Sequence, residues 1–260
     1  MDNLIFSILI KPSDHISNKK QKYFNREKDL TNIKRDYAEY CGADYTVFGD
    51  DDMYKSFCRD LKAKYKTTKF TDRELINFYK FKLLDVNSGM YDNVLYLDFD
   101  VILGDIKSNV FTQFNMQDDF VVCRMKADNR LGWWDKGKTE TGYKILDKSY
   151  KDHWHFNTGI MGASKRVMTQ LDFFSYLPSG LEKLDVLYEK GWPNLGYDNE
   201  LMMSYVAEQT DVNWCHLDYD GQWHRVPNDD LKHDRYSIFL HLRATKDFYL
   251  IDEINPHLSN

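Results

Sequence analysis

The 260-residue sequence has few of the residues that mark specialised classes of protein. It contains four cysteines and five prolines, and no apolar run approaches the roughly 20 residues of a membrane span. The apolar stretch near the N-terminus is short and follows Asp2 rather than a basic residue, which argues against a signal peptide. The cysteines are far apart and form no metal-binding pattern, so we expect free thiols in a reducing compartment; they are Cys41, Cys58, Cys123 and Cys215. These features predict a cytoplasmic protein without a membrane span.

The sequence also lacks an excess of basic residues and any linker rich in proline or glycine. Its 35 basic and 41 acidic residues give a formal net charge of −6, and its pI is near 5.8. This balance gives no reason to expect a nucleic-acid partner. A chain of this length buries a full core, so we expect one domain that spans residues 1–260.

Apolar runs alternate with amphipathic stretches along the chain. The apolar runs predict strands at 4–10, 45–48, 94–97, 120–124, 156–161, 212–217 and 237–242. The amphipathic stretches predict helices at 20–40, in part of 50–69, and at 71–87, 164–176 and 198–208. Strands that alternate with helices favour an α/β fold with a mostly parallel central sheet.

The most informative segment is NVLYLDFDVI, in which an apolar run ends at two aspartates, Asp98 and Asp100. Because side chains alternate across a strand, we expect both carboxylates to project to one side and Phe99 to the other. Two adjacent carboxylates repel each other, and a divalent cation removes that repulsion. Hard oxygen ligands suit Mg²⁺ or Mn²⁺, which keep positions open for substrate phosphates. The segment therefore predicts a metal–diphosphate site at the carboxyl edge of the sheet; the alternative is a solvated strand end.

Four segments together resemble a known family. They are FYKFKLLDVNSGMYDNVLYLDFDVIL, HFNTGIMGAS, GYDNELM and FLHLRATKD, and they extend from Phe78 to Lys246. Their order is similar to that in glycosyltransferases of the glycosyltransferase-A (Rossmann-like) fold, most of all the family 8 nucleotide-sugar transferases. That family includes glycogenin and bacterial lipopolysaccharide galactosyltransferases. The resemblance implies transfer of a sugar from a nucleotide diphosphate sugar, UDP-linked in that family, to a hydroxyl of a glycan or glycoconjugate. The family also favours retention of configuration.

The resemblance implies that Asp98, Asp100 and His241 hold the metal, with Asp98 also near the ribose. A neutral imidazole added to two carboxylates makes a mixed oxygen and nitrogen shell that suits Mn²⁺. The alternative for His241 is a hydrogen-bonded core residue, because the histidine follows the apolar run of the last expected strand.

Further positions match family residues that contact the donor. Lys80 matches a lysine that contacts the nucleotide sugar, with a solvated helix lysine as the alternative. Lys246 follows His241 by five residues rather than six, and the expected glycine is missing. Arg243 is therefore a second candidate for the diphosphate, since its guanidinium suits phosphate oxygens. Ile10 ends the first expected strand, at the turn where the family binds base and ribose.

Three polar residues match the catalytic side of the family. Asn157 in FNTG would face the donor sugar; the alternative is a buried amide satisfied by the backbone. Asp198 and Asn199 match an Asp-Gln pair beside the reacting carbon, and Asp198 also suits a helix N-cap. An inverting route would need a carboxylate base, for which Asp198 and Glu200 are candidates.

Aromatic residues make up 15% of the chain, and several fall between the expected strands at 120–124 and 156–161. Indole rings stack on the apolar faces of sugars. We therefore expect Trp133, Trp134 and Trp154 to contact the acceptor, against the alternative of a core or interface patch.

Two other functions remain open from the sequence. LDFDVIL resembles the signature of haloacid-dehalogenase-like phosphohydrolases, in which the first aspartate, here Asp98, is a nucleophile. In that superfamily the signature lies on the first strand, whereas here more than ninety residues precede it. The second alternative is a non-catalytic sugar-binding protein that keeps a transferase fold.

Overall fold

The computed structural model describes residues 1–10, 24–65, 72–104, 107–126, 144–145, 154–189, 199–218, 223–225, 237–242 and 249–254. The strands are β1 (Asn3–Ile8), β2 (Asp44–Phe48), β3 (Asn93–Leu97), β4 (Val101–Leu103), β5 (Asp119–Lys126), β6 (Trp154–Ala163), β7 (Asn213–Asp218), β8 (His224–Arg225) and β9 (Phe239–His241). The helices are α2 (Glu27–Cys41), α3 (Asp52–Lys64), α4 (Asp72–Ser88), α5 (Val110–Gln113), α7 (Lys165–Leu171), α8 (Phe173–Glu189), α10 (Asn199–Gln209) and α12 (Tyr249–Ile254).

The central sheet has six strands in the order β2-β1-β3-β6-β5-β7. The pairs β1–β2, β1–β3 and β5–β7 are parallel, and β6 is antiparallel to both of its neighbours, β3 and β5. Five strands therefore run in one direction and only β6 is reversed among the described strands of this sheet. This arrangement confirms the predicted α/β class with a mostly parallel sheet.

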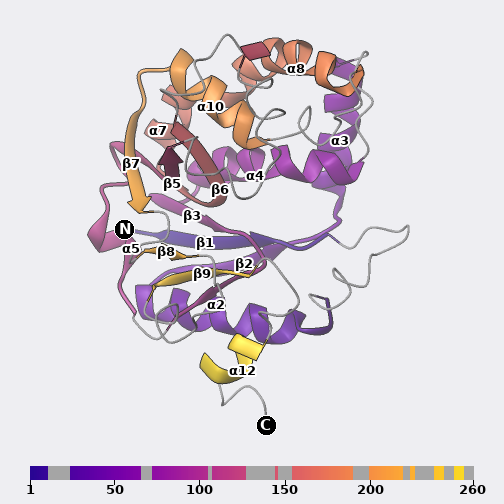
Figure 1. The fold of residues 1–260 in the computed structure, drawn as a ribbon. Coiled ribbons are helices and arrows are strands. Elements are labelled where there is room, and N and C mark those ends of the chain that lie inside the picture. Colours follow the sequence, from indigo (N-terminus) through magenta and orange to yellow (C-terminus); the bar gives the residue numbers. More distant parts are fainter. Residues whose placement is uncertain are drawn as a thin grey trace.

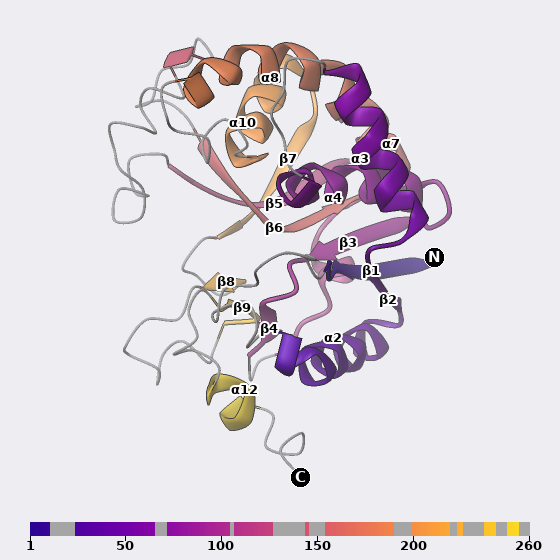
Figure 2. The same ribbon diagram turned by 90° about the vertical axis from the view of Figure 1, so that its right-hand side faces the viewer.

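The central sheet lies between two layers (Figure 1). Helices α3, α4, α7, α8 and α10 cover one face, and α2 lies on the other face together with a small sheet. The turned view in Figure 2 shows the same division. Within the described residues, no helix is both long enough and apolar enough to cross a membrane.

Both faces of the central strands are buried, which explains their continuous apolar runs. In β3, Val94 and Tyr96 pack in the core beneath α4, whereas Leu95 and Leu97 pack in the core beside α2. In β1, Phe6 packs in the core beneath α4 and Ile5 packs in the core beside α2. The strand alternation thus builds two hydrophobic cores, one on each side of the sheet.

Helix ends follow local signals in the sequence. The side chain of Ser164 accepts a hydrogen bond from the backbone N–H of Val167 and begins α7, as a serine N-cap does. Gly42 ends α2 with φ of 65°, a left-handed conformation that glycine adopts without strain. Asp172 also has positive φ, 41°, and it separates α7 from α8. The single helix predicted at 164–176 is therefore two helices.

The small sheet was not predicted as a separate unit. Strand β4 pairs antiparallel with β9, which pairs parallel with β8. In this pairing Val101, just after the acidic segment, lies opposite His241, so two segments 140 residues apart in the sequence are joined by backbone hydrogen bonds. The short runs of β4 and β9 are too brief to reveal this partnership in the sequence.

Candidate active site

The acidic segment is a turn at the carboxyl end of β3. The strand ends at Leu97, and the carbonyl of Asp98 accepts a hydrogen bond from Val101 N–H at 3.0 Å, which closes a four-residue turn. The strand alternation expected across Asp98 and Asp100 is therefore interrupted, because the chain turns between β3 and β4. The two carboxylates nevertheless lie near each other, while Phe99 is buried in the core beside α2.

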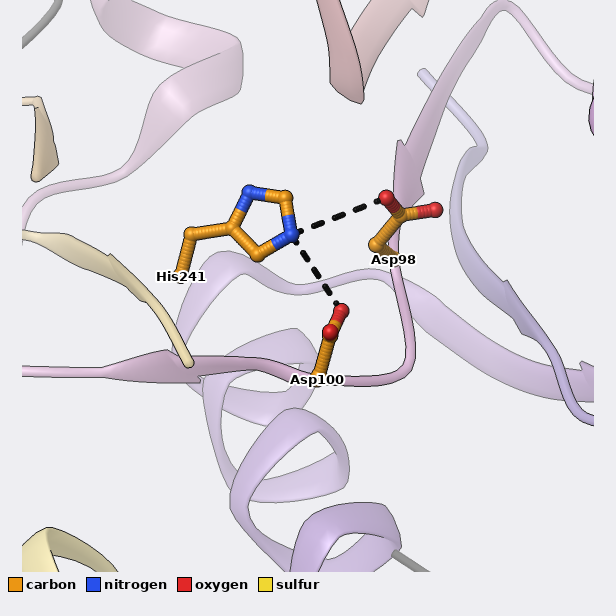
Figure 3. Close-up of side chains that lie close together, drawn as sticks. All are labelled: Asp98, Asp100 and His241. Carbon is orange, nitrogen blue, oxygen red and sulfur yellow. Dashed lines mark ion pairs between the residues drawn. The ribbon is translucent and has the colours of Figure 1, made fainter. Parts of the chain in front are cut away.

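His241, at the end of β9, lies against this turn. Its Nε2 atom is 3.3 Å from Oδ1 of Asp100 and 3.8 Å from Oδ2 of Asp98 (Figure 3). The pairing of β9 with β4 fixes this approach, and Leu242 N–H donates to the carbonyl of Asp100 at 2.9 Å. The backbone thus brings an imidazole from the end of the sequence to the two carboxylates.

The three side chains fit a divalent cation. One ligand atom from each of Asp98, Asp100 and His241 lies within 4.8 Å of the other two. Ligands bound at about 2.1 Å to one octahedral ion lie about 3 Å apart when adjacent and about 4.2 Å apart when opposite. The two separations of His241 Nε2 from the carboxylate oxygens, 3.3 and 3.8 Å, fall in this range. Two carboxylate oxygens suit Mn²⁺ or Mg²⁺, and the imidazole nitrogen favours Mn²⁺.

Gly159 on β6 leaves the space beside these ligands open. A Cβ atom at this position would lie 2.7 Å from Cε1 of His241, 3.0 Å from Oδ2 of Asp98 and 3.0 Å from Oδ1 of Asn157. Its carbonyl accepts a hydrogen bond of 2.7 Å from Asp98 N–H. The close approach of His241 and Asp98 therefore requires a residue without a side chain at position 159.

The two oxygens of the Asp98 carboxylate have different surroundings. Oδ2 faces His241, whereas Oδ1 accepts a hydrogen bond from the hydroxyl of Tyr96 and lies 3.8 Å from Nζ of Lys80. Burial, together with the charge of Asp98, raises the pKa of Tyr96 well above its usual value, so the phenol stays a donor. Tyr96 and Lys80 therefore hold Oδ1, and Oδ2 is left toward the ligand space.

Electrostatics within the group favour ionised Asp100. Burial would raise the pKa of Asp100, but the charge of His241 and its hydrogen bond outweigh burial and lower that pKa below its usual value. The carboxylate is thus charged at neutral pH, as a cation ligand must be.

A buried hydrogen-bond network extends from Lys80 on α4 to Asn199 on α10. Nζ of Lys80 donates to the carbonyl and the hydroxyl of Thr158, both at 3.0 Å, and Nδ2 of Asn199 donates to the same hydroxyl at 2.6 Å. Lys80 is 5% exposed, so the alternative of a solvated helix lysine is wrong. The network connects Lys80, whose ammonium group lies 3.8 Å from Oδ1 of Asp98, to the first turn of α10.

Asn157 and Ile10 lie at the same end of the sheet as the acidic turn. Asn157 Oδ1 accepts a hydrogen bond of 3.0 Å from Gly159 N–H, so the backbone satisfies part of its amide. Its Oδ1 atom also borders the position of a Gly159 Cβ, next to Asp98 and His241. Ile10 follows β1 and packs, partly buried, against the core.

Other predicted site residues lie outside the described residues: Asp198, Arg243, Lys246, Trp133 and Trp134. Trp154 belongs to β6, but its side chain is likewise outside what the structure describes.

Sequence reasoning did not predict the contacts of three residues with the candidate site residues or their turn. Tyr96, near the end of β3, precedes Asp98 by two residues, and this spacing could have indicated the contact. Thr158 lies within the FNTG segment, but its bonds to Lys80 and Asn199 depend on packing between distant helices. Lys34 donates to the carbonyl of Phe99, and nothing in its helical stretch distinguishes it from a solvated lysine.

The fold combines a mostly parallel sheet that has one reversed strand with an acidic turn after β3. No family model and no curated protein matches the sequence. The structure is similar to a glycosyltransferase involved in glycosylation of the major capsid of virus PBCV-1, with a TM-score of 0.55, 12% identity, and coverage of 98% of this chain and 100% of that one. Mouse xyloside xylosyltransferase 1 has a TM-score of 0.53 and 13% identity, covering 94% of this chain and 98% of that chain.

The galactosyltransferase LgtC, solved with donor and acceptor sugar analogues, is also similar. Its TM-score is 0.50 and its identity 11%, with coverage of 94% of this chain and 87% of that chain. At such identities the likeness establishes the fold, and it confirms the predicted glycosyltransferase-A fold. Function has to be argued from the site.

Proposed function

We propose that the protein is a metal-dependent glycosyltransferase. It would transfer a sugar from a nucleotide diphosphate sugar, UDP-linked by the family resemblance, to a hydroxyl of a glycan or glycoconjugate with retention of configuration. The observation that carries the proposal is the group of Asp98, Asp100 and His241 at the carboxyl end of β3, where α/β folds bind ligands. The similar structures named as glycosyltransferases support the same class of reaction.

The bound cation would be Mn²⁺ or Mg²⁺, held by Oδ2 of Asp98, a carboxylate oxygen of Asp100 and Nε2 of His241. When bound, such an ion neutralises negative charge on the diphosphate as the nucleotide leaves. The residues around the ligands keep this geometry: Tyr96 restrains Asp98, and β9 restrains His241.

Cationic side chains would bind the diphosphate from other directions. The ammonium group of Lys80 lies 3.8 Å from Asp98 Oδ1 and is held by Thr158, so a positive charge is fixed beside the metal ligands. Arg243 and Lys246 follow β9 in the sequence, within a few residues of His241. We propose that one of them contacts the phosphates, as the sequence pattern predicts.

The donor sugar would lie toward Asn157, Asp198 and Asn199. Asn157 borders the ligand space, and Asn199 begins α10, whose first turn joins the Thr158 network. A retaining transfer needs no strong protein base, which is consistent with a site built mainly from amides and metal ligands. In an inverting transfer, Asp198 or Glu200 would deprotonate the acceptor.

The acceptor would contact Trp133, Trp134 and Trp154, as predicted from the ability of indole rings to stack on sugars. The last of these precedes the FNTG segment in β6 by two residues.

The direct test is to incubate the protein with a panel of nucleotide sugars and Mn²⁺ and to measure release of the nucleoside diphosphate. We expect release from at least one UDP-sugar, its loss in EDTA, and its loss in Asp100→Asn, which keeps the size of the side chain but removes its charge. Arg166→Gln is a matched control, since this exposed arginine pairs with Asp118 at the other end of β6.

Other outcomes distinguish the alternatives. Release of inorganic phosphate from phosphate monoesters, with a beryllofluoride adduct on Asp98, would indicate a phosphohydrolase. Binding of a nucleotide sugar without release, whatever the acceptor or metal, would indicate a non-catalytic sugar-binding protein. Either result would contradict the proposed reaction.

A further inference from the structure

Lys34 on α2 is the one lysine that the described residues bury completely. Its relative exposure is 0%, and it lies among apolar side chains of the core beside α2, such as Leu30, Ile33 and Tyr37. A buried ammonium group is costly unless its N–H groups have partners. Such a residue in a helix that bears no predicted site residue therefore calls for a specific explanation.

The partners of Lys34 belong to the metal-binding turn. Nζ donates to the carbonyl of Phe99 at 2.8 Å and to the carbonyl of Leu30 at 3.3 Å, and it lies 4.9 Å from the centre of the Phe99 ring. Within the described residues, no carboxylate lies within the 4.0 Å of an ion pair with this ammonium. The strongest contact of Lys34 is thus to the backbone between the two aspartates.

The turn is held at three consecutive carbonyls by three different elements. The carbonyl of Asp98 accepts from Val101 N–H within the turn, and the carbonyl of Asp100 accepts from Leu242 N–H next to β9. The middle carbonyl, that of Phe99, accepts from Lys34 on α2. Because a peptide is planar, fixing this carbonyl also fixes the orientation of the peptide that leads into Asp100.

We propose that Lys34 is a positioning residue of the metal site: by holding the Phe99 carbonyl from α2, it fixes the turn that presents Asp98 and Asp100 to the cation. This inference rests on the proposed metal site and adds a residue that acts through the turn rather than by touching the ion. Groups that orient metal ligands in this way commonly change metal affinity by 10- to 100-fold when they are removed.

The charge of Lys34 acts in the opposite direction to its hydrogen bond. A positive charge behind the carboxylates opposes a cation in front of them, so its loss alone would tighten metal binding. Burial lowers the pKa of Lys34 to about 7, although the charges of Asp100 and Asp98 raise it in part. At pH 8 the group is therefore mostly a neutral amine, which still donates its N–H to Phe99. At that pH the effect of the hydrogen bond is separated from that of the charge.

The test is the affinity of the folded protein for Mn²⁺ at pH 8, measured from the electron paramagnetic resonance signal of free Mn²⁺. We expect Lys34→Met to bind Mn²⁺ about tenfold more weakly than the wild type and to show an altered spectrum of the bound ion. Methionine fits the space of the lysine stem, and loss of the buried amine offsets part of the cost of the unpaired carbonyl. Lys34→Gln, which keeps an N–H donor on a shorter chain, should lie between the two.

Tyr37→Phe is the matched control. Tyr37 lies three residues further along α2, is equally buried, and its hydroxyl donates to the carbonyl of Ser108 at 2.7 Å. Removing that hydroxyl should lower the stability of the protein and leave Mn²⁺ affinity unchanged.

Unchanged or tighter Mn²⁺ binding in Lys34→Met would overturn the proposal. Failure of both Lys34 variants to fold would also overturn it, because Lys34 would then serve the fold as a whole. If the wild type itself binds no Mn²⁺, the metal site fails first, and that failure is seen before any variant is compared.

Discussion

Replacement of Gly159 by alanine tests the geometry of the site with a single added methyl group. The Cβ would lie 2.7 Å from Cε1 of His241, whereas ordinary contacts of this kind begin at 3.4 Å. Relief of the clash therefore requires the imidazole or β6 to move by about 0.7 Å, which exceeds the roughly 0.2 Å tolerance of metal–ligand distances. The same Cβ would lie 3.0 Å from Oδ2 of Asp98, so a second ligand is displaced with the first.

We expect Gly159→Ala to weaken Mn²⁺ binding at least tenfold, which is about 1.4 kcal/mol, and to lower nucleotide release in proportion. The assays are Mn²⁺ titration by electron paramagnetic resonance and release of nucleoside diphosphate. Gly162→Ala is the matched control on the same strand, since its Cβ would meet only the flexible end of Met116 within 3.0 Å. Wild-type Mn²⁺ affinity in Gly159→Ala would refute the proposed arrangement of ligands.

Three further predictions concern the buried network and Lys34. Thr158→Val removes the hydroxyl that accepts from Lys80 and Asn199, so denaturant unfolding should show a loss of about 1–3 kcal/mol, and kcat/KM for the donor should fall. Lys80→Met keeps the apolar stem but removes the charge beside Asp98, and steady-state kinetics should show kcat/KM for the nucleotide sugar reduced about tenfold or more. The pKa of Lys34 is lowered from 10.5 in the unfolded chain to about 7 in the folded protein, so between these two values the unfolded chain holds the proton and the folded protein does not. As pH rises from 7 to 10, the free energy of unfolding of the wild type should therefore increase relative to that of Lys34→Met by about 1.4 kcal/mol per pH unit. Parallel wild-type and Lys34→Met curves across this range would contradict the last prediction, and unchanged kcat/KM in both other variants would contradict the first two.

Much of the fold follows from patterns that are local in the sequence. The apolar runs at β1, β3 and β5 are long because both faces of these strands are buried, and each was predicted within a few residues. Gly42 ends α2 and Ser164 begins α7, and glycine and serine are common residues at these helix ends. The division between α7 and α8 was missed because a non-glycine residue rarely adopts positive φ, although aspartate does so more often than most.

The site was predictable only where its residues share a motif. Asp98 and Asp100 are conspicuous as two charges that follow an apolar run, whereas His241 was assigned by its place in the family pattern. Its approach to Asp100 depends on the pairing of β4 with β9. Each of these strands has three residues, which is too short for the sequence to predict that they pair. Lys34 could not be predicted, because its burial arises from the packing of α2 against a turn 65 residues further along the chain.

The most direct test of the central claim is anomalous diffraction at the manganese edge from crystals grown with Mn²⁺ and UDP. The account predicts one peak within about 2.0–2.2 Å of Nε2 of His241 and of a carboxylate oxygen from each of Asp98 and Asp100. Bound UDP with no peak among these three side chains, or a peak held by other residues, would contradict it.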